Sequence, residues 1–147
     1  MKKFVYKMQS VLNIKEKLEE QEKARYAAAL AKLNEEEEKL SQLYDRRAAC
    51  EERLRESVGA SLNVMAIRHN EDALETLKDF IGRQKLSVKK AQDNVDAAMH
   101  RLREAMAERK THERLKEKAF EEYRAEQNAE EQKEIDELVS YRHGTKE

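Results

Sequence analysis

The most regular feature of the sequence is an apolar repeat of seven residues between Leu74 and Tyr123. Every seventh residue of this stretch falls in one series: Leu74, Ile81, Val88, Val95, Leu102, Arg109, Lys116 and Tyr123. A second series follows three residues behind: Leu77, Gln84, Ala91, Ala98, Ala105, His112 and Ala119. Two such series form the a and d positions of a left-handed coiled coil. A helix with one narrow apolar stripe needs a partner helix along that stripe.

The first part of the chain carries a shorter repeat of the same kind. Phe4, Val11 and Leu18 are spaced by seven residues. A further series continues the repeat: Tyr26, Leu33, Leu40, Arg47 and Leu54. Because Tyr26 comes eight residues after Leu18, we expect a phase shift between the two series. The pattern predicts a first helix over about residues 3–58.

The two repeats are separated by a break near residue 60. Gly59 stands where a helix end favours a left-handed residue. We expect a short helix over residues 62–69, after which Asn70 caps a long helix over residues 70–141. Two long helices with a short interrupted connection predict an all-α fold, a long antiparallel two-helix coiled-coil hairpin that forms a single elongated domain. A parallel homodimer is the alternative, but it would bring the polar residues of each repeat against their own copies.

Composition agrees with a thin helical structure. Of the 147 residues, 41% are charged and 5% aromatic, with no proline and three glycines, which excludes a sizeable compact core. The 30 basic and 31 acidic residues are intermixed, with a net charge of −1, so no strong field favours nucleic acid or an anionic membrane. No apolar run approaches the roughly 18 residues of a membrane span. We therefore expect a soluble protein that reaches membranes only through protein partners.

Candidate chemistry is sparse. Cys50 is the only cysteine, which excludes an intramolecular disulfide and fits a reducing cytoplasm. The glycines form no phosphate-binding loop of the GxxxxGK[ST] kind. The four histidines never fall at i, i+4 spacing and have no cysteine nearby, so no metal site is expected. The sequence predicts no catalytic residues, no cofactor and no enzyme activity.

Charged residues within the repeats suggest how the helices align. Arg109 and Lys116 occupy repeat positions, with Lys110 and Arg114 beside them. We expect the acidic run 35–38 to be a solvated helix face. The alternative is that an antiparallel hairpin brings the basic block near this run, where partial burial would exclude wrong alignments at some cost in stability.

Two candidate partner-binding surfaces follow from the hairpin. Leu43, Leu77 and Phe80 would lie at the hinge end, either as an exposed patch or as residues that widen the seam and cover residues 62–69. The chain ends would form a basic tip at the opposite end. The residues of this basic tip would be Lys2, Lys3, Lys7 and Arg142.

Two segments resemble one protein family. The opening FVYKMQSVLNIKEKLEE, residues 4–20, and ERKTHERLKEK, residues 108–118, are similar to the FliJ family of flagellar protein-export components. The resemblance implies an antiparallel two-helix coiled coil like the central stalk subunit of rotary ATPases, seated in the hexameric ring of the flagellar export ATPase. It also implies contacts with the cytoplasmic part of an export-gate membrane protein and with export chaperones.

From the resemblance we expect a stalk and coupling factor between ATPase ring and export gate. The protein would be cytoplasmic and peripheral at the inner face of the cell membrane. The basic tip would contact the ring, and the hinge-end patch would contact the gate or a chaperone. A general holdase-type chaperone and a purely structural homodimeric coiled coil are the alternatives.

Overall fold

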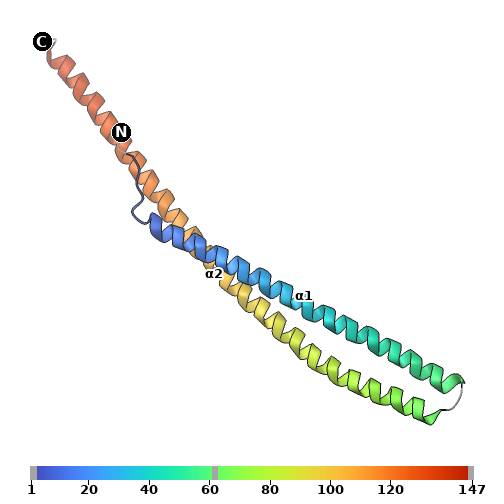
Figure 1. Cartoon of the computed structure of the whole chain (residues 1–147). Coiled ribbons are helices and arrows are strands. Elements are labelled where there is room, and N and C mark those ends of the chain that lie inside the picture. The colour runs from blue at the N-terminus through green and yellow to red at the C-terminus, as the bar shows by residue number, and fades with distance from the viewer. Residues whose placement is uncertain (1–2, 61–62, 146–147) are drawn as a thin grey trace. The chain divides into compact units, whose positions relative to one another are not determined.

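A computed structural model of the chain describes residues 3–60 and 63–145, which form two helices. α1 comprises Gln9–Ala60 and α2 comprises Val64–Thr145. The helices pack against each other in antiparallel directions (Figure 1), and no strand occurs in the described residues. The predicted all-α two-helix hairpin is confirmed.

The start of α2 is set by Asn63 rather than by Asn70. Asn63 Oδ1 accepts hydrogen bonds from the backbone N–H groups of Met65 at 3.2 Å and Ala66 at 3.4 Å, which makes it the N-cap. The separate helix expected over residues 62–69 is therefore the first part of α2 from Val64 onward. Asn70 lies inside α2.

Asn70 connects the two helices instead of capping one. Its side-chain amide donates a hydrogen bond to Ser57 Oγ at 3.2 Å, and its backbone carbonyl accepts one from Cys50 Sγ at 3.5 Å. Ser57 and Cys50 both belong to α1. The first turns of α2 are thus held against the last turns of α1.

The other helix ends also differ from the expected ones. Residues 3–6 are not helical, and α1 begins at Gln9, whose N–H donates to Tyr6 O at 3.2 Å. Gly59 continues α1, and no described glycine has the left-handed backbone expected of a helix cap. α2 extends past Tyr141 to Thr145.

The seam on α2 follows the predicted repeat. Every member of the two series between Leu74 and Tyr123 is buried or half-buried. Ile81 and Ala98 are among the most deeply buried, with 3% and 2% of their surface exposed. The heptad pattern of this helix was therefore sufficient to identify the face that packs against α1.

The seam on α1 shows no phase shift. Its buried and half-buried positions keep a constant spacing of seven: Leu12, Glu19, Tyr26, Leu33, Leu40, Arg47 and Leu54. Leu18, the expected member, is 39% exposed, whereas Glu19 beside it is 5% exposed. Glu19 takes the seam position because it forms an ion pair with Arg109 of α2. The phase shift was predicted because the sequence pattern favoured Leu18, the apolar neighbour of Glu19, as the seam residue.

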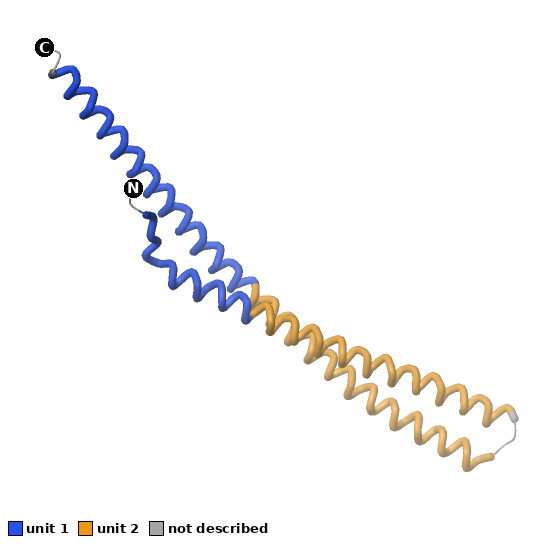
Figure 2. Tube along the Cα trace, turned by 45° about the horizontal axis from the view of Figure 1, so that its top comes forward, with its two compact units in different colours: residues 1–21, 103–147 blue, residues 22–102 orange. Residues whose placement is uncertain are grey.

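The hairpin divides into two compact units (Figure 2). The hinge unit comprises Glu22–Leu102, and the terminal unit comprises Met1–Gln21 and Arg103–Glu147. A core cluster of Leu33, Ala91 and Val95 lies in the hinge unit. Partly buried side chains pack around it: Tyr26, Ala29, Leu30 and Val88. Each unit contains a segment of both helices.

Candidate partner-binding surfaces

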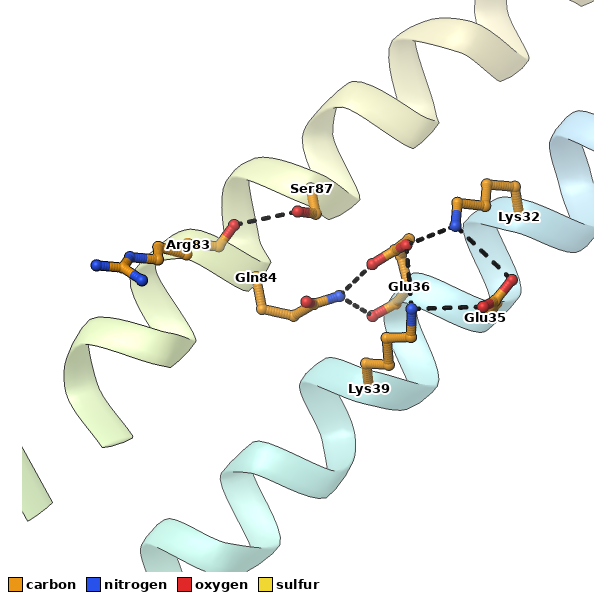
Figure 3. Close-up of polar contacts among 7 residues, drawn as sticks. All are labelled: Lys32, Glu35, Glu36, Lys39, Arg83, Gln84 and Ser87. Atoms are coloured by element: carbon orange, nitrogen blue, oxygen red, sulfur yellow. Dashed lines mark hydrogen bonds and ion pairs between the residues drawn. The ribbon is translucent and has the colours of Figure 1, made fainter. Parts of the chain in front are cut away.

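The seam of the hinge unit contains a buried carboxylate, that of Glu36 (Figure 3). The Gln84 side-chain amide donates to the Glu36 carbonyl oxygen at 2.9 Å and to its carboxylate. Lys32 Nζ lies 3.0 Å from Glu36 Oε1, and Lys39 Nζ lies 3.5 Å from the same oxygen. The Gln84 hydrogen bond, followed by that from Lys32, lowers the pKa of Glu36 to about 2. Glu36 is therefore charged at neutral pH and pairs with one position of α2.

The acidic run that contains Glu36 does not meet the basic block around Arg109. The seam pairs Glu36 with Gln84, and Arg109 with Glu19. In an antiparallel hairpin, facing residues lie about equally far before and after the connection, and Arg109 is much farther from the connection than Glu36 is. The alternative pairing of the acidic run with the basic block was wrong for this geometric reason. A charged seam pair does occur, but with a different carboxylate.

The seam of the terminal unit is rich in charge. The Arg109 guanidinium pairs with Glu19 and, through Nη1, with Glu113 Oε1 at 2.9 Å. Hydrogen bonds from Arg109 to Glu113 and Glu19 raise its pKa. Lys15 Nζ lies 2.8 Å from Glu108 Oε2 and lowers the pKa of that carboxyl. These pairs connect the start of α1 to α2.

The N-terminal segment 3–8 packs an aromatic side chain on α2. The Phe4 ring centroid lies 5.2 Å from that of Phe120, edge to face, and 5.4 Å from that of Tyr123. Phe4 and Tyr6 are half-buried while Val5 between them is 75% exposed, the alternation of an extended chain. We call these ring contacts of Phe4 with Phe120 and Tyr123 the N-terminal clasp. The clasp holds residues 3–8, which precede α1, against α2.

The structure does not bring the predicted basic tip together. Lys2 lies outside the described residues. Lys3 and Lys7 are exposed and line a surface hollow that also includes Glu122 and Glu126. Arg142 is 16 residues beyond Glu126 on α2, roughly 24 Å along the helix. The N-terminal lysines therefore neighbour carboxylates, and Arg142 is separate from them.

The hinge-end patch is divided between the seam and the surface. Leu43 and Leu77 are half-buried, whereas Phe80 is 49% exposed. Tyr44, next to Leu43, is half-buried. The Cζ atom of the Arg47 guanidinium lies over the Tyr44 ring, 4.9 Å from the ring centroid. Of the three predicted residues, only Phe80 is mainly a surface side chain. Their role in binding stays a prediction.

Sequence reasoning missed an exposed apolar stripe near the end of α2. Every residue from 128 to 144 is exposed, and we call this segment the distal arm. Within it Ile135, Leu138 and Val139 are 53%, 62% and 51% exposed. Their i, i+3, i+4 spacing was readable as one helix face, but the stripe lies beyond the end of the heptad series.

The sequence matches the family described as flagellar FliJ protein over residues 3–147. The chain belongs to the FliJ family. The match to the family includes both helices and the connection between them.

The fold of this FliJ-family chain has a solved counterpart in Chlamydia trachomatis. That protein, described as a YscO homologue, superimposes with a TM-score of 0.52 at 21% sequence identity. The alignment covers 99% of this chain and all of the other. The likeness establishes a shared fold. A comparison with curated proteins gives no match.

Membership of the FliJ family supports a role as a component of type III protein export. Neither helix, over the residues described, has a stretch long and apolar enough to cross a membrane. In the same ranges, 3–60 and 63–145, no three His, Cys, Asp or Glu side chains are grouped as metal ligands would be.

Proposed function

We propose that the chain is the central stalk and coupling factor between the hexameric flagellar export ATPase and the export gate. It would also contact export chaperones and assist delivery of their substrates. We place it in the cytoplasm, peripheral to the inner face of the membrane through its partners. It acts without a cofactor and catalyses no reaction itself.

The observation that carries this proposal is the family match over nearly the whole chain. The hairpin supports it physically, because two helices held in one register can transmit a displacement better than a single helix can. Two buried polar pairs, Glu36 with Gln84 and Glu19 with Arg109, oppose sliding of one helix past the other. Sliding by one turn would leave a buried carboxylate without its partner.

The ring contact is tested with the purified export ATPase of the same organism. We expect the unaltered chain to bind the hexamer and to raise its rate of ATP hydrolysis. The full-length chain is compared with an unrelated two-helix hairpin at the same concentration. This control separates specific stimulation of ATP hydrolysis from an effect of crowding. Failure to bind or to stimulate would contradict the stalk assignment, and suppression of client aggregation without ring binding would support the holdase alternative.

The gate contact is tested at the hinge-end patch. We expect Phe80→Ala to weaken binding to the cytoplasmic domain of the export gate with little change in Tm, because Phe80 is 49% exposed. Leu43→Ala and Leu77→Ala should lower Tm as well, since both side chains are half-buried in the seam. Leu86→Ala, at a residue 69% exposed, is the control. Undiminished gate binding by Phe80→Ala would remove this residue from the contact.

A further inference from the structure

The distal arm is a helical segment whose apolar stripe is not covered within the terminal unit. α2 continues past the N-terminal segment that carries the clasp, and the arm lies in that continuation (Figure 1). Ile135, Leu138 and Val139 lie on one face and each is at least half exposed. Helices that bind in a groove use anchors with this i, i+3, i+4 spacing.

The charges around the stripe indicate what can cover it. The distal arm includes five acidic and two basic side chains, a formal charge of −3 with histidine neutral. One of the basic side chains, Arg142, lines a surface hollow together with the three apolar residues of the stripe. At 100° per residue, Glu134 and Asp136 lie on opposite edges of the stripe and Glu131 lies at its start. Asp136 is held by a hydrogen bond from Gln132 at 3.1 Å. Both edges of the apolar face are therefore acidic.

This arrangement disfavours a second copy of the arm as the occupant. Two arms packed on their stripes would bring carboxylates at the edges of one close to those of the other. The apolar contact of such a pair would extend over little more than one helical turn, too little for a stable interface. A partner with basic edges would instead gain both apolar burial and charge attraction.

We propose that the distal arm docks in a protein groove that has an apolar floor and rims of lysine and arginine. Ile135, Leu138 and Val139 enter the floor, and Glu131, Glu134 and Asp136 face the rims. This inference rests on the proposed function, in which the groove belongs to the ATPase ring. The proposal assigns the ring contact to the acidic distal arm instead of the predicted basic tip, whose residues lie apart.

The test measures binding of full-length variants to the purified export ATPase hexamer. The variant Ile135→Ala, Leu138→Ala and Val139→Ala removes the anchors and keeps the arm helical, because alanine favours helix. We expect affinity to fall at least roughly tenfold. Met65→Ala with Leu86→Ala, residues 76% and 69% exposed in the hinge unit, is the matched control and should bind as the unaltered chain does.

Charge is tested separately from the anchors. The variant Glu131→Gln, Glu134→Gln and Asp136→Asn should associate more slowly, and its affinity should depend less on salt concentration. Lys3→Gln with Lys7→Gln should leave the affinity unchanged. Circular dichroism of each variant reports whether the helix content is kept.

The outcomes distinguish this inference from the proposed function. If the unaltered chain binds and the alanine variant binds equally well, the arm is not the contact, and the stalk proposal stands. An unchanged salt dependence in the charge variant, or a loss of affinity in the lysine variant, would overturn the basic groove. If the unaltered chain does not bind the hexamer, the ring contact itself fails and the inference fails with it.

Discussion

The hinge and terminal units use the same two helices but different seams. In the hinge unit Leu33, Ala91 and Val95 form an apolar cluster. Glu36 and Gln84 form a polar pair within the same unit. In the terminal unit Arg109 and Glu19 occupy seam positions, and Lys15 pairs with Glu108 beside them. Apolar burial stabilises without direction, whereas an ion pair mainly selects which residues face each other. The comparison suggests that the hinge unit contributes more stability and the terminal unit more alignment.

The largest expected effect is the loss of an apolar seam residue in the hinge unit. Leu33 is 7% exposed, so Leu33→Ala should lower the free energy of unfolding by about 2–4 kcal/mol. Chemical denaturation measures this change. Leu86→Ala, at a residue 69% exposed, should change it by less than about 0.5 kcal/mol. Equal effects at the two sites would mean that the hinge unit is not stabilised by its apolar seam.

The next effect concerns the ion pair of the terminal unit. Arg109→Leu removes the ion pair that Arg109 forms with the buried Glu19 carboxylate, and Tm should fall by roughly 5 °C or more. Glu19→Leu combined with Arg109→Leu should recover most of that loss, because both charges are removed. Differential scanning calorimetry compares the variants. Size-exclusion chromatography with light scattering shows whether the double variant adopts new oligomers. A single variant as stable as the unaltered chain would contradict the role of the pair.

A smaller effect is expected at the N-terminal clasp. Phe4→Ala removes ring contacts with Phe120 and Tyr123, and the terminal unit should lose about 1 kcal/mol of local stability. Hydrogen exchange of the first turns of α1 measures local opening. Exchange in the hinge unit should not change and serves as the internal control. Faster exchange in both units would show that the clasp supports more than its own unit.

The smallest effect is a pH dependence in the hinge unit. The pKa of Glu36 is lowered to about 2, so its charged form stabilises the folded chain above the ordinary pKa of 4.5. That contribution is lost as the pH falls from about 4.5 to about 2. Glu36→Gln should be less stable at neutral pH and lose less stability in this acidic range. Parallel Tm–pH curves for the two proteins would contradict the pKa assignment.

The sequence predicted the fold well where apolar residues mark the seam. The two series on α2 identified its packed face because nearly every position carried an apolar or small side chain up to Ala105. The prediction for α1 failed at Leu18 because hydrophobicity favours leucine over glutamate, and only the position of Arg109 in space reverses that choice. The cap was misplaced for a similar reason, since Asn63 and Asn70 are the same residue type and local sequence does not rank them.

The candidate surfaces were harder to predict than the fold. The basic tip assumed that the two chain ends coincide, but α1 begins at Gln9 and α2 continues to Thr145. The overhang depends on which residues face each other across the whole hairpin. That pairing is set by contacts such as Asn70 with Ser57, which join residues distant in sequence. The stripe of Ile135, Leu138 and Val139 was visible in the sequence, but its exposure was not.

The buried thiol of Cys50 can report local separation of α1 from α2 in the hinge unit. This thiol is 1% exposed and hydrogen-bonded to the Asn70 carbonyl across the seam. A thiol reagent reaches this sulfur only when α1 and α2 separate locally, so the labelling rate measures the free energy of that opening. Because the chain has no other cysteine, each molecule adds one label and mass spectrometry can count it without any substitution. Partner binding that stiffens the hinge unit would then appear as slower labelling of the natural protein.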